Sequence, residues 1–125
     1  MDDLLIPDYC SSTPDMNIWL GPEGTVSPMH HDPKHNLLTQ VRGHKRVLLF
    51  PPDQAGLYPF SEECLMSNTS QVDPENPDLN QFPLFSGAKG LGCLLGPGDV
   101  LYIPPKWWHH VRSLTASLSV SFWWE

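Results

Sequence analysis

Proline and glycine are the residues that most limit what this chain can fold into. The sequence contains 14 prolines and 9 glycines among 125 residues. They recur along the chain in clusters such as Gly21-Pro22-Glu23-Gly24, Pro51-Pro52 and Gly96-Pro97-Gly98. Proline breaks helix interiors, and both residues favour turns. This distribution disfavours long helices and predicts short strands joined by turns.

Seven or eight segments between these turns have strand character. In the last of them, Ser117, Ser119 and Ser121 alternate with apolar residues, a period of two that is typical of a half-buried antiparallel strand. The small serine face indicates a cavity or a ligand beside it. Pro28 indicates a sheet edge or an irregularity in its strand. The predicted strands cover residues 17–20, 25–32, 36–41, 45–50, 92–95, 100–103, 107–114 and 117–124. We therefore expect an all-β sandwich or barrel.

The rest of the chain is irregular. Residues 1–15 show no periodic pattern, and residues 53–58 are compatible with one helical turn. Residues 59–90 form the least regular third and include Asp73-Pro74-Glu75-Asn76-Pro77-Asp78, which neither a helix nor a central strand would tolerate. A loop of this length in a small domain is uncommon and is often functional.

Size and charge exclude several classes of protein. The length predicts a single domain, and no run of about 18 apolar residues is present to span a membrane. The chain has 7 basic and 14 acidic residues, for a net charge of −7, so we expect no direct binding to nucleic acid and a preference for basic partners.

The cysteines and the N-terminal residues predict the compartment. Cys10, Cys64 and Cys93 form no CxxC pair, and we expect buried or half-buried free thiols. The first residues resemble no secretory signal. We therefore expect an intracellular location, nuclear or cytoplasmic.

Histidines carry the strongest chemical signal. On a strand His30 and Asp32 share one face and His31 takes the other. A second histidine from a distant strand would complete a two-histidine, one-carboxylate triad, whose usual metal is non-haem Fe(II). His109 and His110 are neighbours that point to opposite faces, so at most one can serve, and spacing does not choose between them. The remaining histidines, His35 and His44, lie in turn regions and are expected to be solvated.

Lys45 is the candidate for binding an acid. It shares a strand face with the apolar Val47 and Leu49, which favours a position inside the barrel, paired with the carboxylate of a small acid. The alternative is a surface lysine on an edge strand. Taken alone, Asn36 and Ser27 read as ordinary strand residues.

Together these residues resemble the JmjC-domain Fe(II)/2-oxoglutarate oxygenases, and within them the branch of lysine-specific demethylase 8 and the arginyl hydroxylases. The resemblance runs from about Ile6 to Glu125 and keeps one order along the chain. It is carried by Ser27–Pro33, Asn36, Gly43–Lys45, the loop motifs Asn68–Asp73 and Glu75–Leu79, Pro97–Pro104, Trp108–Arg112 and Ser119–Trp124.

The resemblance implies a double-stranded β-helix, a cupin or jelly-roll barrel. It implies Fe(II) bound by His30, Asp32 and, as the first histidine after the tryptophan, His109. It assigns Lys45 to the far carboxylate of 2-oxoglutarate, with Asn36 and Ser27 beside it and Trp123 near the same pocket. O2 is the other co-substrate, and no catalytic residue is implied beyond the metal ligands.

The implied activity is hydroxylation of a side chain in a basic protein or peptide, with arginine the first expectation and lysine demethylation the second. Family members carry a further N-terminal part, with helices and a tyrosine that shares the 2-oxoglutarate carboxylate. We therefore expect residues 1–125 to be a single, truncated JmjC catalytic core. Two alternatives stay open: a metal-binding cupin-like module without turnover, and a cupin isomerase or small-molecule dioxygenase that needs no lysine.

Overall fold

The structure is a computed structural model that describes residues 14–125. Cys10 and most of the irregular segment expected at residues 1–15 lie outside these residues. The described part contains eight strands and one short 3-10 helix, which confirms the predicted all-β class, and it holds no helix long and apolar enough to cross a membrane. The elements are β1 (Asp15–Gly21), β2 (Val26–His30), β3 (His35–Arg42), β4 (Lys45–Phe50), η1 (Pro83–Gly87), β5 (Leu91–Leu95), β6 (Val100–Ile103), β7 (Trp108–Ser113) and β8 (Ser117–Trp124).

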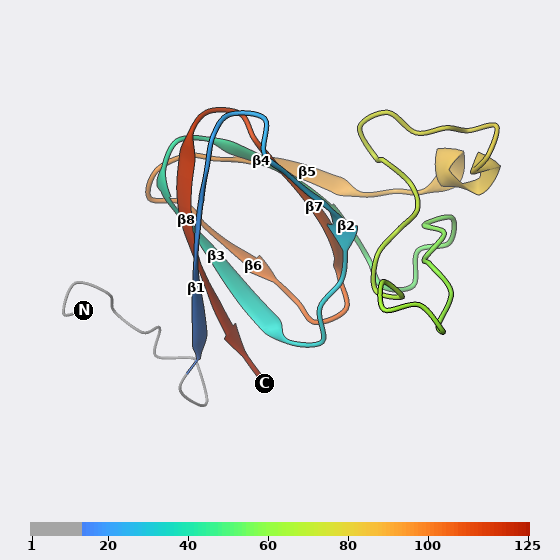
Figure 1. The fold of residues 1–125 in the computed structure, drawn as a ribbon, viewed down its shortest axis with the longest axis horizontal. Helices are drawn as coiled ribbons and strands as arrows, with labels where there is room; N and C mark the ends of the chain where they lie inside the picture. Colours follow the sequence, from blue (N-terminus) through green and yellow to red (C-terminus); the bar gives the residue numbers. More distant parts are fainter. Residues whose placement is uncertain (1–13) are drawn as a thin grey trace.

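The strands form two four-stranded antiparallel sheets that face each other (Figure 1). One sheet has the order β1-β8-β3-β6 and the other β2-β7-β4-β5. Strands from the two halves of the chain are paired in a nested way, β1 with β8, β2 with β7, β3 with β6 and β4 with β5. This is the double-stranded β-helix that the resemblance implied. Both features that Pro28 indicated are present, because β2 lies at a sheet edge and its register shifts between Ser27 and His30.

The interior between the sheets is filled from alternate strand positions. In β4, Lys45, Val47 and Leu49 are all buried, as the shared face predicted. Val47 and Leu49 pack with Leu38 and Ile103 from the opposite sheet. Such packing across two sheets is the main stabilisation of a sandwich core.

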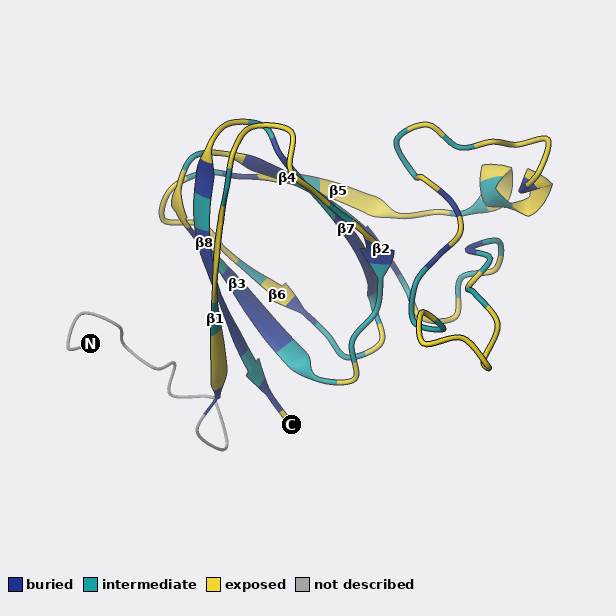
Figure 2. Ribbon diagram, viewed as in Figure 1, coloured by how far each residue is buried: buried dark blue, intermediate teal, exposed yellow. Residues whose placement is uncertain are grey.

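Strand β8 is buried on both faces rather than on one. Its serines, Ser117, Ser119 and Ser121, are at most 3% exposed, and Val120 and Phe122 pack with Leu37 and Trp124 on the other face. The half-buried expectation was wrong because the apolar side chains of β8 and of its neighbour β3 bury one another on this second face. Figure 2 shows the buried residues along β3 and β8.

The helical turn expected at residues 53–58 is absent from this part of the described chain. Gly56 and Tyr58 have φ values of +86° and +46°, which lie outside the right-handed helical region. A Cβ on Gly56 would also lie 2.5 Å from the carbonyl oxygen of Leu84, so the close approach of the chain requires glycine here. Residues 51–54 form a tight turn instead, in which the Gln54 amide donates to the Pro51 carbonyl over 3.2 Å.

The long segment between β4 and β5 is irregular, as predicted, but it is packed. It lies beside the β2-β7-β4-β5 sheet (Figure 1). Its Leu57, Val72 and Phe82 are buried and pack against Phe50 and Trp108 of that sheet. The segment also carries Cys64, which is exposed, contrary to the expectation of a buried or half-buried thiol. Cys93 is half-buried, as expected, and both thiols are free.

A charged cluster fixes the same segment to the sheet. Glu75, whose side chain is 12% exposed, accepts two hydrogen bonds from Arg112 Nε, at 2.8 and 2.9 Å, and forms an ion pair with Arg46. His110 Nε2 lies 3.4 Å from the same carboxylate. These partners come from β4 and β7, so Glu75 holds the long segment onto the outer face of the sheet.

Replacing Glu75 with alanine is expected to lower the free energy of unfolding by about 2 kcal/mol, because two arginines lose a carboxylate that is mostly withdrawn from water. Urea unfolding would measure this. Glu62→Ala, an exposed position in the same segment, is the control and should change stability by no more than about 0.5 kcal/mol. Equal stabilities of the two variants would contradict the role given to Glu75.

Candidate metal centre

The end of β2 brings two of the predicted ligands together. The pairing of β2 with β7 shifts register between Ser27 and His30. Beyond the shift, Met29 points outward into the cluster beneath the long segment, while His30 and Asp32 line the interior cavity. His31 is placed on the outer side, where its ring meets Trp108 edge-on with centroids 4.6 Å apart. Strand alternation therefore separates His31 from its two neighbours, as expected.

The structure places the two distal histidines on opposite faces of β7. On β7, His109 is the direct cross-strand partner of His30 and is 5% exposed. His110 points to the opposite face, where it meets Glu75. Of the two, only His109 faces the cavity that holds His30 and Asp32.

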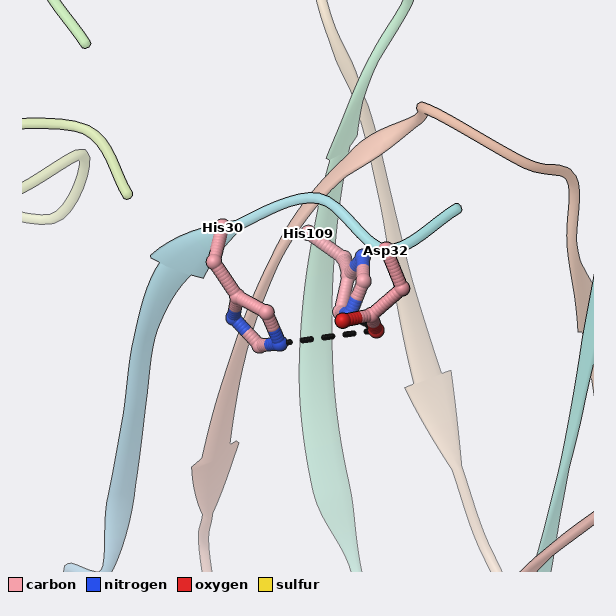
Figure 3. Close-up of side chains that lie close together, drawn as sticks. All are labelled: His30, Asp32 and His109. Atoms are coloured by element: carbon pink, nitrogen blue, oxygen red, sulfur yellow. Dashed lines mark ion pairs between the residues drawn. The ribbon is translucent and has the colours of Figure 1, made fainter. Parts of the chain in front are cut away.

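His30, Asp32 and His109 converge (Figure 3). Asp32 Oδ2 lies 3.6 Å from His30 Nε2 and 3.4 Å from His109 Nε2. One candidate ligand atom from each of the three residues lies within 4.8 Å of the others. Two imidazoles and one carboxylate at this spacing suit a divalent transition metal that binds nitrogen and oxygen ligands.

Backbone contacts hold both imidazoles in a ligating orientation. His30 Nδ1 lies 2.7 Å from the Pro28 carbonyl, and His109 Nδ1 lies 3.0 Å from the Trp107 carbonyl. A ring whose Nδ1–H donates to a carbonyl carries its free lone pair on Nε2. Both Nε2 atoms face Asp32, so the two rings are set in the tautomer that a metal requires.

The electrostatics also favour metal binding. Burial first, and then the neighbouring His109, lower the pKa of the His30 imidazole, which favours its neutral form. Close contact with the His109 ring is the main cause that lowers the pKa of the Asp32 carboxyl, which favours its ionised form. A neutral imidazole and an ionised carboxylate are the forms that bind metals.

A backbone hydrogen bond from the turn before β7 also holds Asp32 in place. Lys106 has a φ of +69°, uncommon for a residue other than glycine. In this conformation its amide donates to the Asp32 carbonyl over 2.8 Å. The turn before β7 therefore holds the backbone of one candidate ligand while β7 itself provides another.

The same interior holds the residues predicted for an acid. His30, Asp32 and His109 line a cavity of about 360 Å³ together with Lys45, Asn36, Ser27 and Trp123. Its volume suits a small organic molecule. Asn36 and Lys45 come from opposite sheets, and the residues are 5% and 7% exposed, respectively.

Three polar groups of this cavity lack partners among the described residues. Lys45 forms no ion pair with residues 14–125, and burial lowers the pKa of its ammonium. Asn36 Oδ1 and Trp123 Nε1 are buried without a hydrogen-bond partner within that range. A buried cation beside unpaired polar atoms is costly unless an anion completes the set, so the cavity fits a small carboxylic acid.

Sequence reasoning missed Trp19, which also lines the cavity. Its ring meets Trp123 edge-on with centroids 6.1 Å apart, and its Nε1 donates to Ser121 Oγ over 3.0 Å. The serine face of β8, which indicated a cavity, was the signal that could have pointed to it. His35 is not simply solvated as expected: its ring stacks on Trp124 at 5.1 Å and its Nδ1 lies 2.7 Å from Tyr102 Oη. His44 is exposed, as expected.

Comparison with protein families gives one match that covers most of the chain. The model of the cupin-like domain family matches residues 4–125.

Several curated proteins are similar over 99% of this chain. Identity is 53% over 129 residues with lysine-specific demethylase JMJ30 of Arabidopsis thaliana, of which 30% is covered. It is 54% over 132 residues with Jumonji C domain-containing protein 5 of Drosophila melanogaster, of which 33% is covered. It is 49% over 131 residues with lysine-specific demethylase 8 of Xenopus tropicalis, of which 29% is covered. The chain thus spans about a third of the length of these relatives.

Solved structures share the fold. An X-ray structure of Escherichia coli ycfD aligns with a TM-score of 0.61 and 23% identity, covering 89% of this chain and 25% of that one. A structure of YcfD, described as a ribosomal oxygenase in complex with cobalt and 2-oxoglutarate, aligns with a TM-score of 0.58 and 22% identity, covering 89% of this chain and 23% of that one. At these identities the likeness extends to the fold alone.

Proposed function

The chain belongs to the cupin-like JmjC family of domains, and on that premise we propose that it is the catalytic core of an Fe(II)- and 2-oxoglutarate-dependent oxygenase. The observation that carries the proposal is one cavity with two unlike parts. It holds a two-histidine, one-carboxylate cluster and a buried lysine that has no counter-ion among residues 14–125. Such a cavity suits a metal and an acid together.

The residues fit both groups. His30, Asp32 and His109 would hold the Fe(II), and three ligands on one side leave positions for other molecules. Lys45 would form a charge-assisted contact with the far carboxylate of 2-oxoglutarate. Trp123 Nε1 can donate to the same acid, and the Asn36 amide can turn to present its NH2 group. When bound, the iron and the 2-oxo acid supply the oxidation chemistry with O2, while the barrel orients the acid and excludes water.

The alternative of a cupin enzyme that uses no 2-oxo acid gives no role to Lys45. A buried ammonium in an apolar strand face costs free energy unless an anion binds it. A metal-binding module without turnover remains the competing outcome, and the assay below distinguishes it.

We propose a side chain of a basic protein or peptide as the substrate, with arginine first. The resemblance to the arginyl hydroxylase branch and the excess of 14 acidic over 7 basic residues support this choice. Relatives named lysine-specific demethylases make methyl-lysine the competing substrate.

The test is a turnover assay with Fe(II), 2-oxoglutarate and O2 against matched peptides that contain arginine, lysine or methyl-lysine. We expect succinate to form, and the arginine peptide to gain the mass of one oxygen. Loss of a methyl group from the methyl-lysine peptide alone would replace hydroxylation with demethylation. Metal binding with no succinate from any peptide would support the module without turnover.

A further inference from the structure

The segment that carries two of the candidate ligands is held from outside the barrel by the long segment. Where β2 leaves its regular pairing with β7, the stretch Asn68–Ser70 lies antiparallel to it, with a bridge between His30 and Thr69. The Ser70 amide donates to the Met29 carbonyl over 2.9 Å. The end of β2 therefore has β7 on one side and a short substitute strand on the other.

Asn68 forms two hydrogen bonds with His31, the residue between the candidate ligands His30 and Asp32. The His31 amide donates to the Asn68 carbonyl over 2.9 Å, and Asn68 Nδ2 donates to the His31 carbonyl over 3.0 Å. These two bonds occupy both backbone polar groups of His31. The first bond would form with any residue at position 68, whereas the second requires a side chain that donates at this reach.

The bond to the His31 carbonyl orients the peptide that joins His31 to Asp32. The next carbonyl, that of Asp32, is held by the Lys106 amide at 2.8 Å. Two successive carbonyls are thus fixed, one by the long segment and one by the turn before β7. With both fixed, the backbone keeps His30 and Asp32 on the cavity side and His31 outside.

Asn68 is itself firmly placed. Two residues later, Ser70 is buried, and its hydroxyl donates to the Leu57 carbonyl over 2.5 Å and accepts from the Val72 amide over 3.0 Å. Val72 lies in the apolar cluster over the sheet, and Glu75 is paired with the arginines of β4 and β7. The hydrogen bonds to His31 therefore come from a stretch of chain that is itself held in place.

We propose that Asn68 is a positioning residue of the metal centre, which sets the spacing of His30 and Asp32 through the backbone of His31. This inference rests on the proposed function, because it requires that His30, Asp32 and His109 bind a metal. Asn68 does not line the cavity, so it acts through the ligands and touches neither the metal nor the acid.

The test measures Co(II) binding to the full chain by calorimetry and by visible absorption. Co(II) stands in for Fe(II) because it is a redox-stable ion. Asn68→Ala is expected to lower Co(II) affinity about tenfold, the usual effect of losing a residue that orients ligands, and to alter the absorption bands. Asn80→Ala, an exposed asparagine of the same segment, is the matched control and should keep wild-type affinity and bands. Asn68→Ser, whose hydroxyl does not reach His31 but which keeps a polar residue, serves if the alanine variant does not fold.

Each outcome of this experiment either supports or overturns the positioning role of Asn68. Wild-type affinity and bands in folded Asn68→Ala or Asn68→Ser would overturn the positioning role and leave the proposed function intact. A lower melting temperature with unchanged affinity would also overturn it, because that result assigns Asn68 to stability alone. If the wild-type chain itself binds no Co(II), the proposed function fails and this inference fails with it.

Discussion

His109→Ala is expected to lower Co(II) affinity by about 100-fold or more and to abolish turnover of 2-oxoglutarate. The substitution removes one of three candidate ligand side chains, whereas changes to groups that only orient ligands already cost about 10- to 100-fold. No other histidine within residues 14–125 joins His30 and Asp32 in a ligand cluster. Calorimetry with Co(II) and a succinate assay would measure the two losses.

The control for this prediction is the adjacent residue. His110→Ala removes the same side chain from the other face of β7, where it meets Glu75. We expect a less stable protein that still binds one equivalent of metal with affinity close to wild type. The reverse pattern, with metal lost in His110→Ala and kept in His109→Ala, would show that the ligands are assigned wrongly.

Lys45→Met is expected to have two opposite effects. Binding of 2-oxoglutarate should weaken by about 100-fold, since the charge-assisted contact is lost. The free energy of unfolding should rise by about 1 kcal/mol, because an apolar chain of similar length replaces a buried ammonium without a counter-ion among the described residues. Calorimetry of the metal-loaded protein and urea unfolding of the metal-free protein would measure them.

The stability gained by Lys45→Met should depend on pH. Burial lowers the pKa of Lys45 in the folded chain, so the unfolded chain binds more protons at pH values between the lowered pKa and the ordinary value of 10.5. Wild-type stability therefore rises with pH through this window relative to Lys45→Met, and the difference between the two proteins narrows. A stability difference between the two proteins that widened with pH would contradict a buried, charged lysine.

Arg46→Met is the matched control for Lys45→Met. Arg46 is the next residue of β4, points to the outer face and pairs with Glu75. The control should keep 2-oxoglutarate binding and lose stability, which is the opposite pattern. A loss of 2-oxoglutarate binding in both variants would mean that the effect comes from damage to β4 rather than from the cavity.

Local patterns predicted the parts of the fold and site that depend on strand alternation. Alternation placed Lys45 with Val47 and Leu49 and separated His31 from His30 and Asp32, because neighbouring strand residues face opposite ways. It failed to choose between His109 and His110 for the same reason: two adjacent histidines satisfy it equally. The choice needs the register of β7 against β2, which depends on contacts between distant parts of the chain.

The contributions of the long segment could not be predicted. Asn68 and Glu75 lie in a stretch without periodicity, and their partners, His31, Arg46 and Arg112, lie far away in the chain. The family resemblance includes the two motifs that contain them, but their local pattern does not indicate which distant residues they contact. Burial of β8 on both faces was missed for a related reason, since the neighbours of a strand are not encoded in its own pattern.

The nested pairing of the strands has a consequence for folding kinetics. Taken as a whole, the barrel is one long hairpin rolled up on itself, and the long segment between β4 and β5 is its tip. If pairing spreads from this tip outward, β2 meets β7 after β4 meets β5 and β3 meets β6, the order set by the nested pairs. We therefore expect His30 and His109 to become neighbours late, when earlier pairing has already shortened the loop between them. On this order the candidate metal centre would form only in a nearly complete barrel, and a bound ion would stabilise that state over all earlier ones.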